Sequence, residues 1–413
     1  MQFIYQLFLW CYGGGIRIAS LWNNKAKSWV MGRRRFPVIE HKKSKTVWMH
    51  CASLGEFEQG RPLLENIRKT YPDTTIVLTF FSPSGYEVQH NYPGADYVFY
   101  LPMDGRRNTK QWLDILQPSL VLWVKYEFWY YHLAALKNTD VPVLMVSGIF
   151  RPGQPFFKWY GGVWRRMLYS FTHFFVQNEE SRLLLQSLGH TNSTVGGDTR
   201  FDRVIEIAEN ARPLPLIEKF CKGREVIIAG STWEDDEAEW THYVRSHRDI
   251  CFIFAPHEVD AANIADVKKE FPGSILYSEL EKNNSPEEMS AHVLIIDNIG
   301  MLSQLYRYAT ITYVGGGFDA GGIHNILEAV VYGKPVIFGP NYEKFAEAVD
   351  LVDTGVAFSI DSAVELEQLL TQLWGDEQRL QEIGYKAKNY VMAKAGATRQ
   401  VMAYIQANRL LTN

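Results

Sequence analysis

The sequence has 413 residues, of which 46% are hydrophobic and 21% are charged. This length is too great for one ordinary hydrophobic core and predicts two domains, and the composition excludes wholesale disorder. The four cysteines, Cys11, Cys51, Cys221 and Cys251, lie far apart, which excludes a C-x-x-C zinc site and favours free thiols in the core.

The charge is distributed unevenly along the chain. Residues 1–45 carry nine Lys or Arg and a single acid, Glu40, for a formal charge of +8, whereas the other 368 residues sum to −12. A basic end on an acidic body indicates an anionic surface as a partner.

The N-terminal segment suggests which surface this is. Residues 1–16 are uncharged and rich in aromatic side chains, and basic residues follow from Arg17 to Arg35. The apolar run is shorter than the roughly 20 residues of a transmembrane helix and is interrupted by Gly13–Gly15. Its charges follow the apolar stretch, unlike those of a signal peptide. We therefore predict that residues 1–35 form a membrane-associating segment, with the rest of the chain cytoplasmic. The alternative is a terminal helix docked on the protein's own core.

The body of the chain alternates short apolar runs with amphipathic stretches, which predicts parallel βαβ units. We assign residues 46–209 to a first α/β domain, 210–223 to a linker and 224–413 to a second α/β domain with C-terminal helices. The expected strands of the first domain are Thr46–His50, Thr75–Phe80, Tyr97–Leu101, Leu120–Val124, Val143–Ser147 and Phe174–Gln177. Those of the second are Glu225–Ala229, Cys251–Ala255, His292–Asp297, Thr310–Val314, Pro335–Phe338 and Val356–Ile360.

Loops at three strand ends of the second domain are suited to an anion, because small residues expose backbone N–H groups at a helix start. They are Gly315-Gly316-Gly317, Gly230-Ser231-Thr232 and Pro256-His257. A dinucleotide site is disfavoured, because no acid ends the next strand at Phe338. Simple helix capping is the alternative for Ser231 and Thr232. Glu328 is expected to accept hydrogen bonds from ribose hydroxyls or, alternatively, to be a helix-start acid.

The first domain offers a candidate general base. Glu56 follows the first strand, where a carboxylate at the mouth of a cleft can take a proton; as an isolated residue it fits a helix-start acid equally well. The segment Lys125–Trp129 follows another strand, and a helix is expected over Glu127–Lys137. Arg200, in G-D-T-R-F-D, is expected to face an anion.

Taken in order, seven motifs resemble the 3-deoxy-D-manno-octulosonic acid (Kdo) transferases of lipopolysaccharide biosynthesis. They are H-x-x-S-x-G-E (His50–Glu56), T-x-F-S-P-S-G (Thr79–Gly85), K-Y-E-F-W, G-D-T-R-F-D, G-S-T-W-E, D-N-I-G-x-L and G-G-x-x-N-I-L-E. The resemblance implies a GT-B fold and inverting transfer of Kdo from CMP-Kdo to a lipid A precursor at the cytoplasmic face of the inner membrane, without a metal or other cofactor.

The resemblance also implies residue roles. Glu56 would be the base, and Glu127 and Arg200 would support the transition state. The implied CMP contacts are Pro256, His257, Ile299, Gly300, Met301, Asn325, Ile326, Leu327 and Glu328. Four positions depart from the family, which commonly has Lys at Arg200, Arg at His257, Glu at Met301 and Pro at Ile326. The His257 difference puts in doubt a permanent charge near the phosphate.

Two alternatives remain open. One is a GT-B enzyme that uses another nucleotide sugar, such as a UDP-sugar transferase or epimerase. The other is a membrane-bound scaffold that kept the fold and lost the chemistry, against which Glu56, Glu127 and the glycine loops argue.

Overall fold

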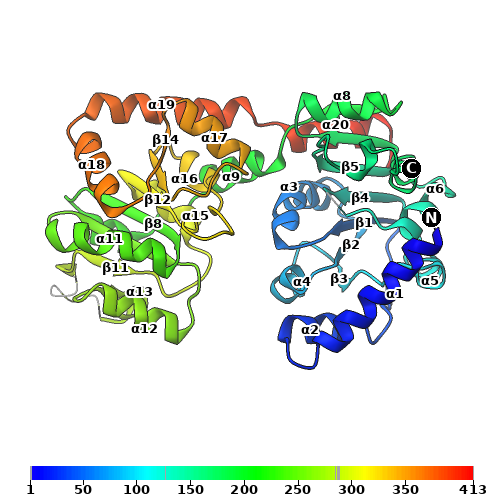
Figure 1. Cartoon of the computed structure of the whole chain (residues 1–413), viewed down its shortest axis with the longest axis horizontal. Coiled ribbons are helices and arrows are strands. Elements are labelled where there is room, and N and C mark those ends of the chain that lie inside the picture. Colours follow the sequence, from blue (N-terminus) through cyan, green and yellow to red (C-terminus); the bar gives the residue numbers. More distant parts are fainter. Residues whose placement is uncertain (1, 126, 284, 286–288, 413) are drawn as a thin grey trace. The chain divides into compact units, whose positions relative to one another are not determined.

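The computed structural model describes residues 2–125, 127–283, 285 and 289–412. Tyr126, the second residue of the K-Y-E-F-W motif, lies outside the described residues. The contacts divide the chain into two compact units, traced in Figure 1. The first unit comprises Met1–Arg203 and Lys394–Asn413, and the second comprises Val204–Ala393.

The first unit is built on a parallel sheet with the strand order β3-β2-β1-β4-β5-β6-β7. Its strands are β1 (Lys45–Cys51), β2 (Thr74–Phe80), β3 (Tyr97–Tyr100), β4 (Leu120–Val124), β5 (Val143–Gly148), β6 (His173–Val176) and β7 (Ser193–Val195). The sequence does not predict β7, because a strand of three residues at a sheet edge is too short to show a period.

Helices cover both faces of this sheet. They are α1 (Gln2–Ala19), α2 (Asn24–Gly32), α3 (Leu54–Thr70), α4 (Pro83–Gln89), α5 (Arg106–Leu116), α6 (Tyr130–Lys137), η1 (Pro155–Phe157), α7 (Gly162–Leu168), α8 (Glu179–Ser187) and α20 (Ala397–Ala407). Because side chains alternate along a strand, β1 contributes to two cores. Trp48 packs with Trp112 and Trp123 on one face, and Met49 packs with α3 on the other.

The second unit repeats this design in the strand order β10-β11-β9-β8-β12-β13-β14. Its strands are β8 (Val226–Thr232), β9 (Cys251–Pro256), β10 (Ile275–Leu276), β11 (Val293–Ile295), β12 (Ile311–Val314), β13 (Val336–Phe338) and β14 (Ala357–Ser359). Its helices are α10 (Pro215–Cys221), α11 (Glu234–Ser246), α12 (Ala261–Glu270), α13 (Tyr277–Asn283), α15 (Leu302–Leu305), η2 (Tyr306–Tyr308), α16 (Leu327–Val330), α17 (Ala346–Asp353), α18 (Ala363–Trp374) and α19 (Glu377–Ala393).

The predicted domain boundaries need correction at two places. Residues 215–221 of the expected linker form α10, whose Ile217 and Phe220 are buried, and the division between the units falls inside α9 (Thr199–Glu209). At the C-terminus, α20 belongs to the first unit, where Val401 and Ile405 join the core around Val47. Assigning all of 224–413 to the second domain was therefore wrong for the last 20 residues.

The N-terminal segment also differs from its prediction. α1 runs through Gly13–Gly15 without a break, and Cys11 on it is exposed, unlike the core thiol that the sequence suggests. Tyr5 and Leu9 pack against the first unit, so the docked-helix alternative holds for one face of α1. Among the described residues, no helix is both long and apolar enough to cross a membrane.

Each sheet has a switch point, where two adjacent strands continue to opposite sides of the sheet. In the first unit it lies between β1 and β4, and in the second between β8 and β12. Loops at the carboxyl ends of strands on either side of such a switch point form the usual ligand site of open α/β sheets. Glu56 and Glu127 follow β1 and β4, Gly230 lies within the last residues of β8, and Gly315 follows β12. The cleft between the two domains remains a prediction.

Candidate active site

Glu56 lies in the first turn of α3, directly after β1 and the N-cap residue Ser53. Its side chain is only 9% exposed, and Oε2 accepts a hydrogen bond from the backbone N–H of Ala52. This contact is what a helix-start acid makes, and it also fixes the carboxylate at the switch point of the first sheet. The two interpretations of Glu56 are therefore compatible, because the contact that ties the first turn of α3 to the residue before its N-cap also orients a candidate base.

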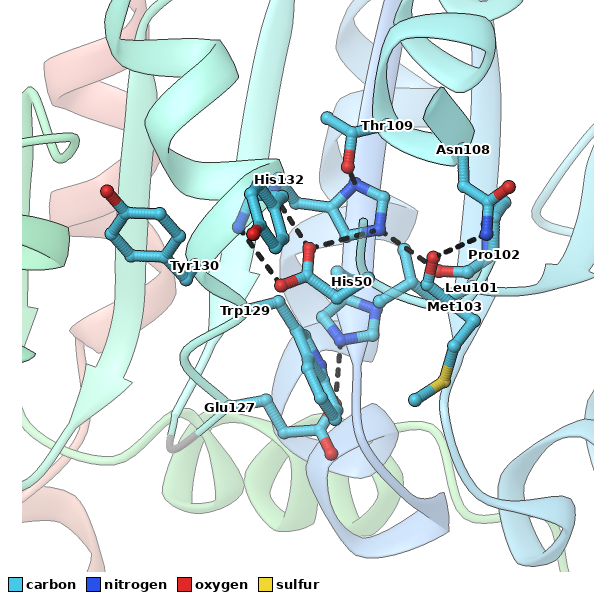
Figure 2. Close-up of polar contacts among 12 residues, drawn as sticks. His50, Leu101, Pro102, Met103, Asn108, Thr109, Glu127, Trp129, Tyr130 and His132 are labelled. Carbon is cyan, nitrogen blue, oxygen red and sulfur yellow. Dashed lines mark hydrogen bonds and ion pairs between the residues drawn. The ribbon is translucent and has the colours of Figure 1, made fainter. Parts of the chain in front are cut away.

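Glu127 lies in the loop between β4 and α6, not in the helix that the sequence predicts, because α6 begins only at Tyr130. Its Oε2 accepts two hydrogen bonds, from His50 Nε2 at 2.9 Å and from Trp129 Nε1 at 3.0 Å (Figure 2). A carboxylate that accepts two such bonds is held in one orientation.

His50 is the residue that joins Glu127 to the core. It is fully buried at the end of β1, and its Nδ1 lies 3.0 Å from Thr79 Oγ1, which also accepts a hydrogen bond from Trp48 Nε1 at 2.8 Å. The Thr79 hydroxyl has one proton, which it donates either to His50 Nδ1 or to the carbonyl oxygen of Met49 at 3.4 Å. Sequence reasoning missed this role, although His50 begins the first family motif.

Arg200 is positioned by a carboxylate of its own. Its Nε and backbone N–H donate to Asp198 at 2.9 Å each, and the amide of Gln59 donates to the same carboxylate at 3.1–3.2 Å. Gln59 lies one turn after Glu56 on α3. Asp198 therefore orients the guanidinium and ties it to the helix that carries the candidate base.

The three candidate catalytic residues thus gather at the carboxyl end of one sheet. Burial raises the pKa of the Cys51 thiol well above its usual value, and the nearby carboxylates of Glu56 and Glu127 raise it further. Two residues at this edge, Lys125 and Ser147, adopt a left-handed backbone conformation (φ +57° and +52°). Such strain in residues other than glycine is frequent at functional sites.

The apolar side of this site is a pocket of about 480 Å³. It lies between the N-terminal half of α1, the loop that carries Glu127, and α7. Its lining residues are Ile4, Tyr5, Phe8, Glu127, Phe128, Trp129, Val163, Trp164 and Met167. The aromatic residues of the K-Y-E-F-W motif are therefore partly a pocket wall and not only core.

In the second unit, Asp236 organises the glycine loop. This buried carboxylate accepts hydrogen bonds from Tyr313 Oη at 2.6 Å, Gly316 N at 2.8 Å and Trp233 N at 2.9 Å. Because Gly315 N donates to Gly230 O, the N–H groups of Gly315 and Gly316 are both used within the protein. The prediction that these two N–H groups are open to an anion was wrong.

Ser231 and Thr232 end β8 and do not cap the following helix, so the capping alternative is not followed either. The N-cap of α11 is Trp233, and Thr232 Oγ1 donates instead to Glu237 at 2.8 Å, while Ser231 has a left-handed backbone (φ +54°). A Cβ on Gly315 would lie 2.3 Å from Ser231 O, and one on Gly317 would lie 2.5 Å from Gly339 N. These glycines are needed for the close packing of the strand ends themselves.

Three rings stack beside these loops. The ring of His257 lies 4.6 Å from that of Trp233 and 4.3 Å from that of His324. Trp233 Nε1 donates to His324 Nε2 at 3.0 Å, so the proton of neutral His324 is on Nδ1. Burial lowers the pKa of His324 to about 4 and also lowers that of His257. Sequence reasoning missed His324, although it lies inside the glycine-rich motif.

The other predicted CMP contacts occupy neighbouring strand ends. Pro256 ends β9, Gly300 (φ +101°) lies in the loop after β11 with the exposed Ile299, and Met301 precedes α15. Ile326 and Leu327 are buried at the start of α16. Asn325 Nδ2 donates to Glu328 at 3.1 Å, whereas its buried Oδ1 has no hydrogen-bond partner among the described residues. An acceptor left in this way fits a ligand donor such as a hydroxyl or amino group.

No group of three or more potential metal ligands occurs in the described part of the chain.

Two solved structures share this architecture. A UDP-GlcNAc 2-epimerase from Neisseria meningitidis superposes with a TM-score of 0.61 at 14% identity, over 88% of this chain and 100% of that one. MurG from Acinetobacter baumannii gives a TM-score of 0.54 at 13% identity, over 88% and 99%. At these identities the likeness concerns the fold, which is the two-domain GT-B fold.

Comparisons with known sequences indicate which family of GT-B proteins this chain resembles. A family model described as 3-deoxy-D-manno-octulosonic-acid transferase matches residues 31–203. Kdo transferases from Aquifex aeolicus and Rickettsia felis are 26% and 25% identical, over 83% and 82% of this chain and 90% and 74% of theirs. A bifunctional glycosyltransferase/methyltransferase from Fusobacterium nucleatum is 23% identical, and this chain spans 57% of its length. The chain is a glycosyltransferase, its residues 31–203 match the Kdo transferase family model, and it is similar to Kdo transferases over most of its length.

Proposed function

We propose that this chain transfers Kdo from CMP-Kdo to an acylated, phosphorylated lipid A precursor in lipopolysaccharide biosynthesis. The main support for this proposal is that the family match and the candidate catalytic residues fall in the same unit. The family match covers the unit in which Glu56, Glu127 and Arg200 lie at one sheet edge. The UDP-sugar alternative has support only from fold likeness at low identity.

In the proposed reaction, Glu56 removes the proton from the acceptor hydroxyl as its oxygen bonds to the anomeric carbon of Kdo. The bond between that carbon and the phosphate breaks at the same time, and CMP leaves as an anion. One displacement inverts the centre and needs one base, with no covalent intermediate. The carboxylate of Glu127, fixed by His50 and Trp129, favours the positive charge that develops on the sugar.

The donor would bind the second unit. His257, stacked between Trp233 and His324, takes the place of the arginine that the family commonly carries. The unpaired Oδ1 of Asn325 and the neighbouring Glu328 provide acceptors for nucleoside hydroxyls or amino groups. The acyl chains of the acceptor suit the apolar pocket beside Glu127.

The proposed location is the cytoplasmic face of the inner membrane, with the N-terminal segment bound to anionic lipid. One face of α1 supports this, because it presents large apolar side chains to solvent, among them Phe3, Leu7 and Trp10. Helices with such a face and basic neighbours bind membrane interfaces.

The test of the base is Glu56→Gln, because a glutamine oxygen still accepts from Ala52 and keeps the helix start intact. We expect kcat for Kdo transfer to fall by about 10³-fold or more, while CMP binding, measured by isothermal titration, stays unchanged. The matched control is Glu58→Gln on the same helix, which should retain activity. Near-normal turnover in E56Q would reject the base assignment, and tighter binding of UDP than of CMP would reject the donor.

A further inference from the structure

A cavity of about 980 Å³ lies in the first unit, apart from the candidate catalytic residues. It lies between α1, the end of α2 with the segment that follows, and the loop before α5. Six arginines from these three separate stretches line it: Arg17, Arg33, Arg34, Arg35, Arg106 and Arg107. The sequence groups only four of them, because Arg106 and Arg107 are some 70 residues further along the chain.

The positive charge of this cavity is not neutralised within the protein. Asp104 is the one acid among its described lining residues. That carboxylate already accepts hydrogen bonds from Tyr5 Oη at 2.7 Å and from the backbone N–H groups of Tyr131 and His132 at 3.0 Å. Asp104 therefore fastens α1 to the start of α6 and is not paired with an arginine.

Arg33 is held without any carboxylate. It donates to the carbonyl oxygens of Leu101 and Phe81 at 2.9 and 2.7 Å, and its guanidinium lies over the rings of Trp29 and Tyr100. Burial lowers its pKa to about 9, which leaves it charged at neutral pH. Arg33 is therefore a fixed part of the cavity wall.

The other five arginines are available to a ligand. In the described part of the chain, Arg17, Arg34, Arg35, Arg106 and Arg107 form no ion pair, and their side chains donate no hydrogen bond to protein. Like charges gathered in one cavity repel one another, so an anion should bind there. Because a guanidinium donates two parallel hydrogen bonds to a phosphate, the arrangement favours a phosphate group.

The surroundings indicate what carries that phosphate. The cavity is far larger than one phosphate, and its walls include Leu9, Trp10 and Trp29. The same helix, α1, borders the apolar pocket of about 480 Å³ through Ile4 and Phe8. A ligand with a phosphate on a sugar and an attached acyl chain matches a basic cavity and an apolar pocket that share one helix.

We propose that the arginine cavity binds a phosphate group of the acylated acceptor. This inference rests on the proposed function, which supplies an acceptor of that class. A chain of contacts joins the cavity to the catalytic residues. Arg33 donates to Phe81 O, the ring of Phe81 lies 4.5 Å from that of Trp129, and Trp129 donates to Glu127. A phosphate held at one end therefore places the sugar near Glu127 at the other.

The test uses Arg106→Gln with Arg107→Gln, since both side chains are exposed and unpaired and their loss should leave the fold intact. Binding to the phosphorylated acyl-disaccharide in neutral detergent micelles, without donor, should weaken by about tenfold or more. Binding to the same lipid after enzymatic removal of its phosphates should not change. The charge-matched control is Arg245→Gln with Arg248→Gln, two exposed residues of the second unit, which should bind both lipids as the wild type does.

The controls separate the sources of phosphate and the two proposals. An equal loss for both lipids, or no loss for either, would overturn the cavity assignment. A loss of binding to vesicles of phosphatidylglycerol with unchanged binding to the phosphorylated acyl-disaccharide would also overturn it, because the cavity would then serve bulk lipid. Since no donor is present, the result stands whether or not Kdo transfer is observed. Failure of transfer alone would contradict only the proposed function.

Discussion

At the scale of single residues, the two candidate catalytic carboxylates, Glu56 and Glu127, differ in how far the local sequence predicts their orientation. Glu56 is visible as an acid at a helix start, and its contact with Ala52 belongs to that local role. The orientation of Glu127 depends instead on His50, 77 residues earlier in the chain. A local pattern therefore finds the first carboxylate, whereas the second acquires its geometry only when β1 and β4 pair.

His257 occupies a position where the Kdo transferases that this sequence resembles commonly have arginine. An arginine keeps its charge at every physiological pH, whereas an imidazole titrates. Burial lowers the pKa of His257, and the nearby Glu258 opposes that effect. His324 is less suited to become charged, because its Nε2 accepts from Trp233 and its pKa is about 4, with Asp319 as the nearby acid. His257 is therefore the group that would pair with a phosphate.

We expect binding of a stable CMP phosphodiester analogue to take up a proton. A phosphate beside His257 favours the imidazolium, so the bound state has the higher pKa and affinity rises as the pH falls from about 8 to about 6. The gain approaches tenfold for each unit by which the pKa rises on binding. Isothermal titration at both pH values, in buffers of different ionisation enthalpy, measures the affinity and the proton uptake together.

Two variants make that measurement decisive. His257→Arg carries its charge at both pH values and should lose the pH dependence of binding. His242→Arg changes an exposed histidine on α11 and should keep it. The same pH dependence in H257R as in the wild type would show that another group titrates.

At the scale of elements, one buried carboxylate joins three of them. Asp236 lies on α11, and its partners belong to the turn before α11, to β12 and to the glycine loop. Burial raises the pKa of Asp236, although the three hydrogen bonds oppose that rise. Its neighbour Asp235 occupies the same first turn but is exposed to solvent. The two residues are indistinguishable in the sequence as helix-start acids.

Asp236→Ala should therefore be far more damaging than Asp235→Ala. Removing the carboxylate leaves buried donors on Tyr313, Gly316 and Trp233 without a partner, which should cost on the order of 3 kcal/mol of unfolding free energy. The loosened glycine loop should also weaken CMP binding. Chemical denaturation and CMP titration of both variants check this. Equal effects of D236A and D235A would mean that the buried network does not organise the loop.

At the scale of the whole molecule, α1 has two faces with different surroundings. Tyr5, Leu9 and Tyr12 contact the first unit through its core and its aromatic contacts. Phe3, Leu7, Trp10 and Ile18 recur at three-, four- and eight-residue intervals, which places them on one stripe of the helix, and all four are exposed. Because the inner face is already packed, the outer stripe is the part available to a membrane.

Replacing Phe3, Leu7 and Ile18 by Ser should weaken binding to vesicles that contain anionic phospholipid. Each apolar side chain that enters the interface contributes about tenfold in affinity. Flotation of the protein with such vesicles measures the loss. Changing Val364, Tyr385 and Met392 to Ser, which are exposed in the second unit, serves as the control. Unchanged flotation of the α1 variant would contradict the proposed membrane association.

Much of the fold could be predicted because parallel strands buried on both faces appear as short apolar runs. Twelve strands were expected from such runs, and all twelve are present to within a few residues. The short edge strands β7 and β10 were missed, because their contacts come from neighbouring strands and leave little local pattern. The helix expected at Glu127 begins three residues later, since residues 127–129 serve as a loop that holds a carboxylate and a pocket wall.

The sequence by itself determined the two α/β domains, the resemblance to Kdo transferases and the strand ends that carry the candidate residues, because these depend on local apolar runs and motif order. Only the tertiary structure decided which groups meet. It joined α20 to the first unit, used the N–H groups of Gly315 and Gly316 internally, and brought Arg106 and Arg107 beside Arg17 and Arg33. These outcomes depend on which distant surfaces pack together, and that packing leaves no periodic trace along the chain.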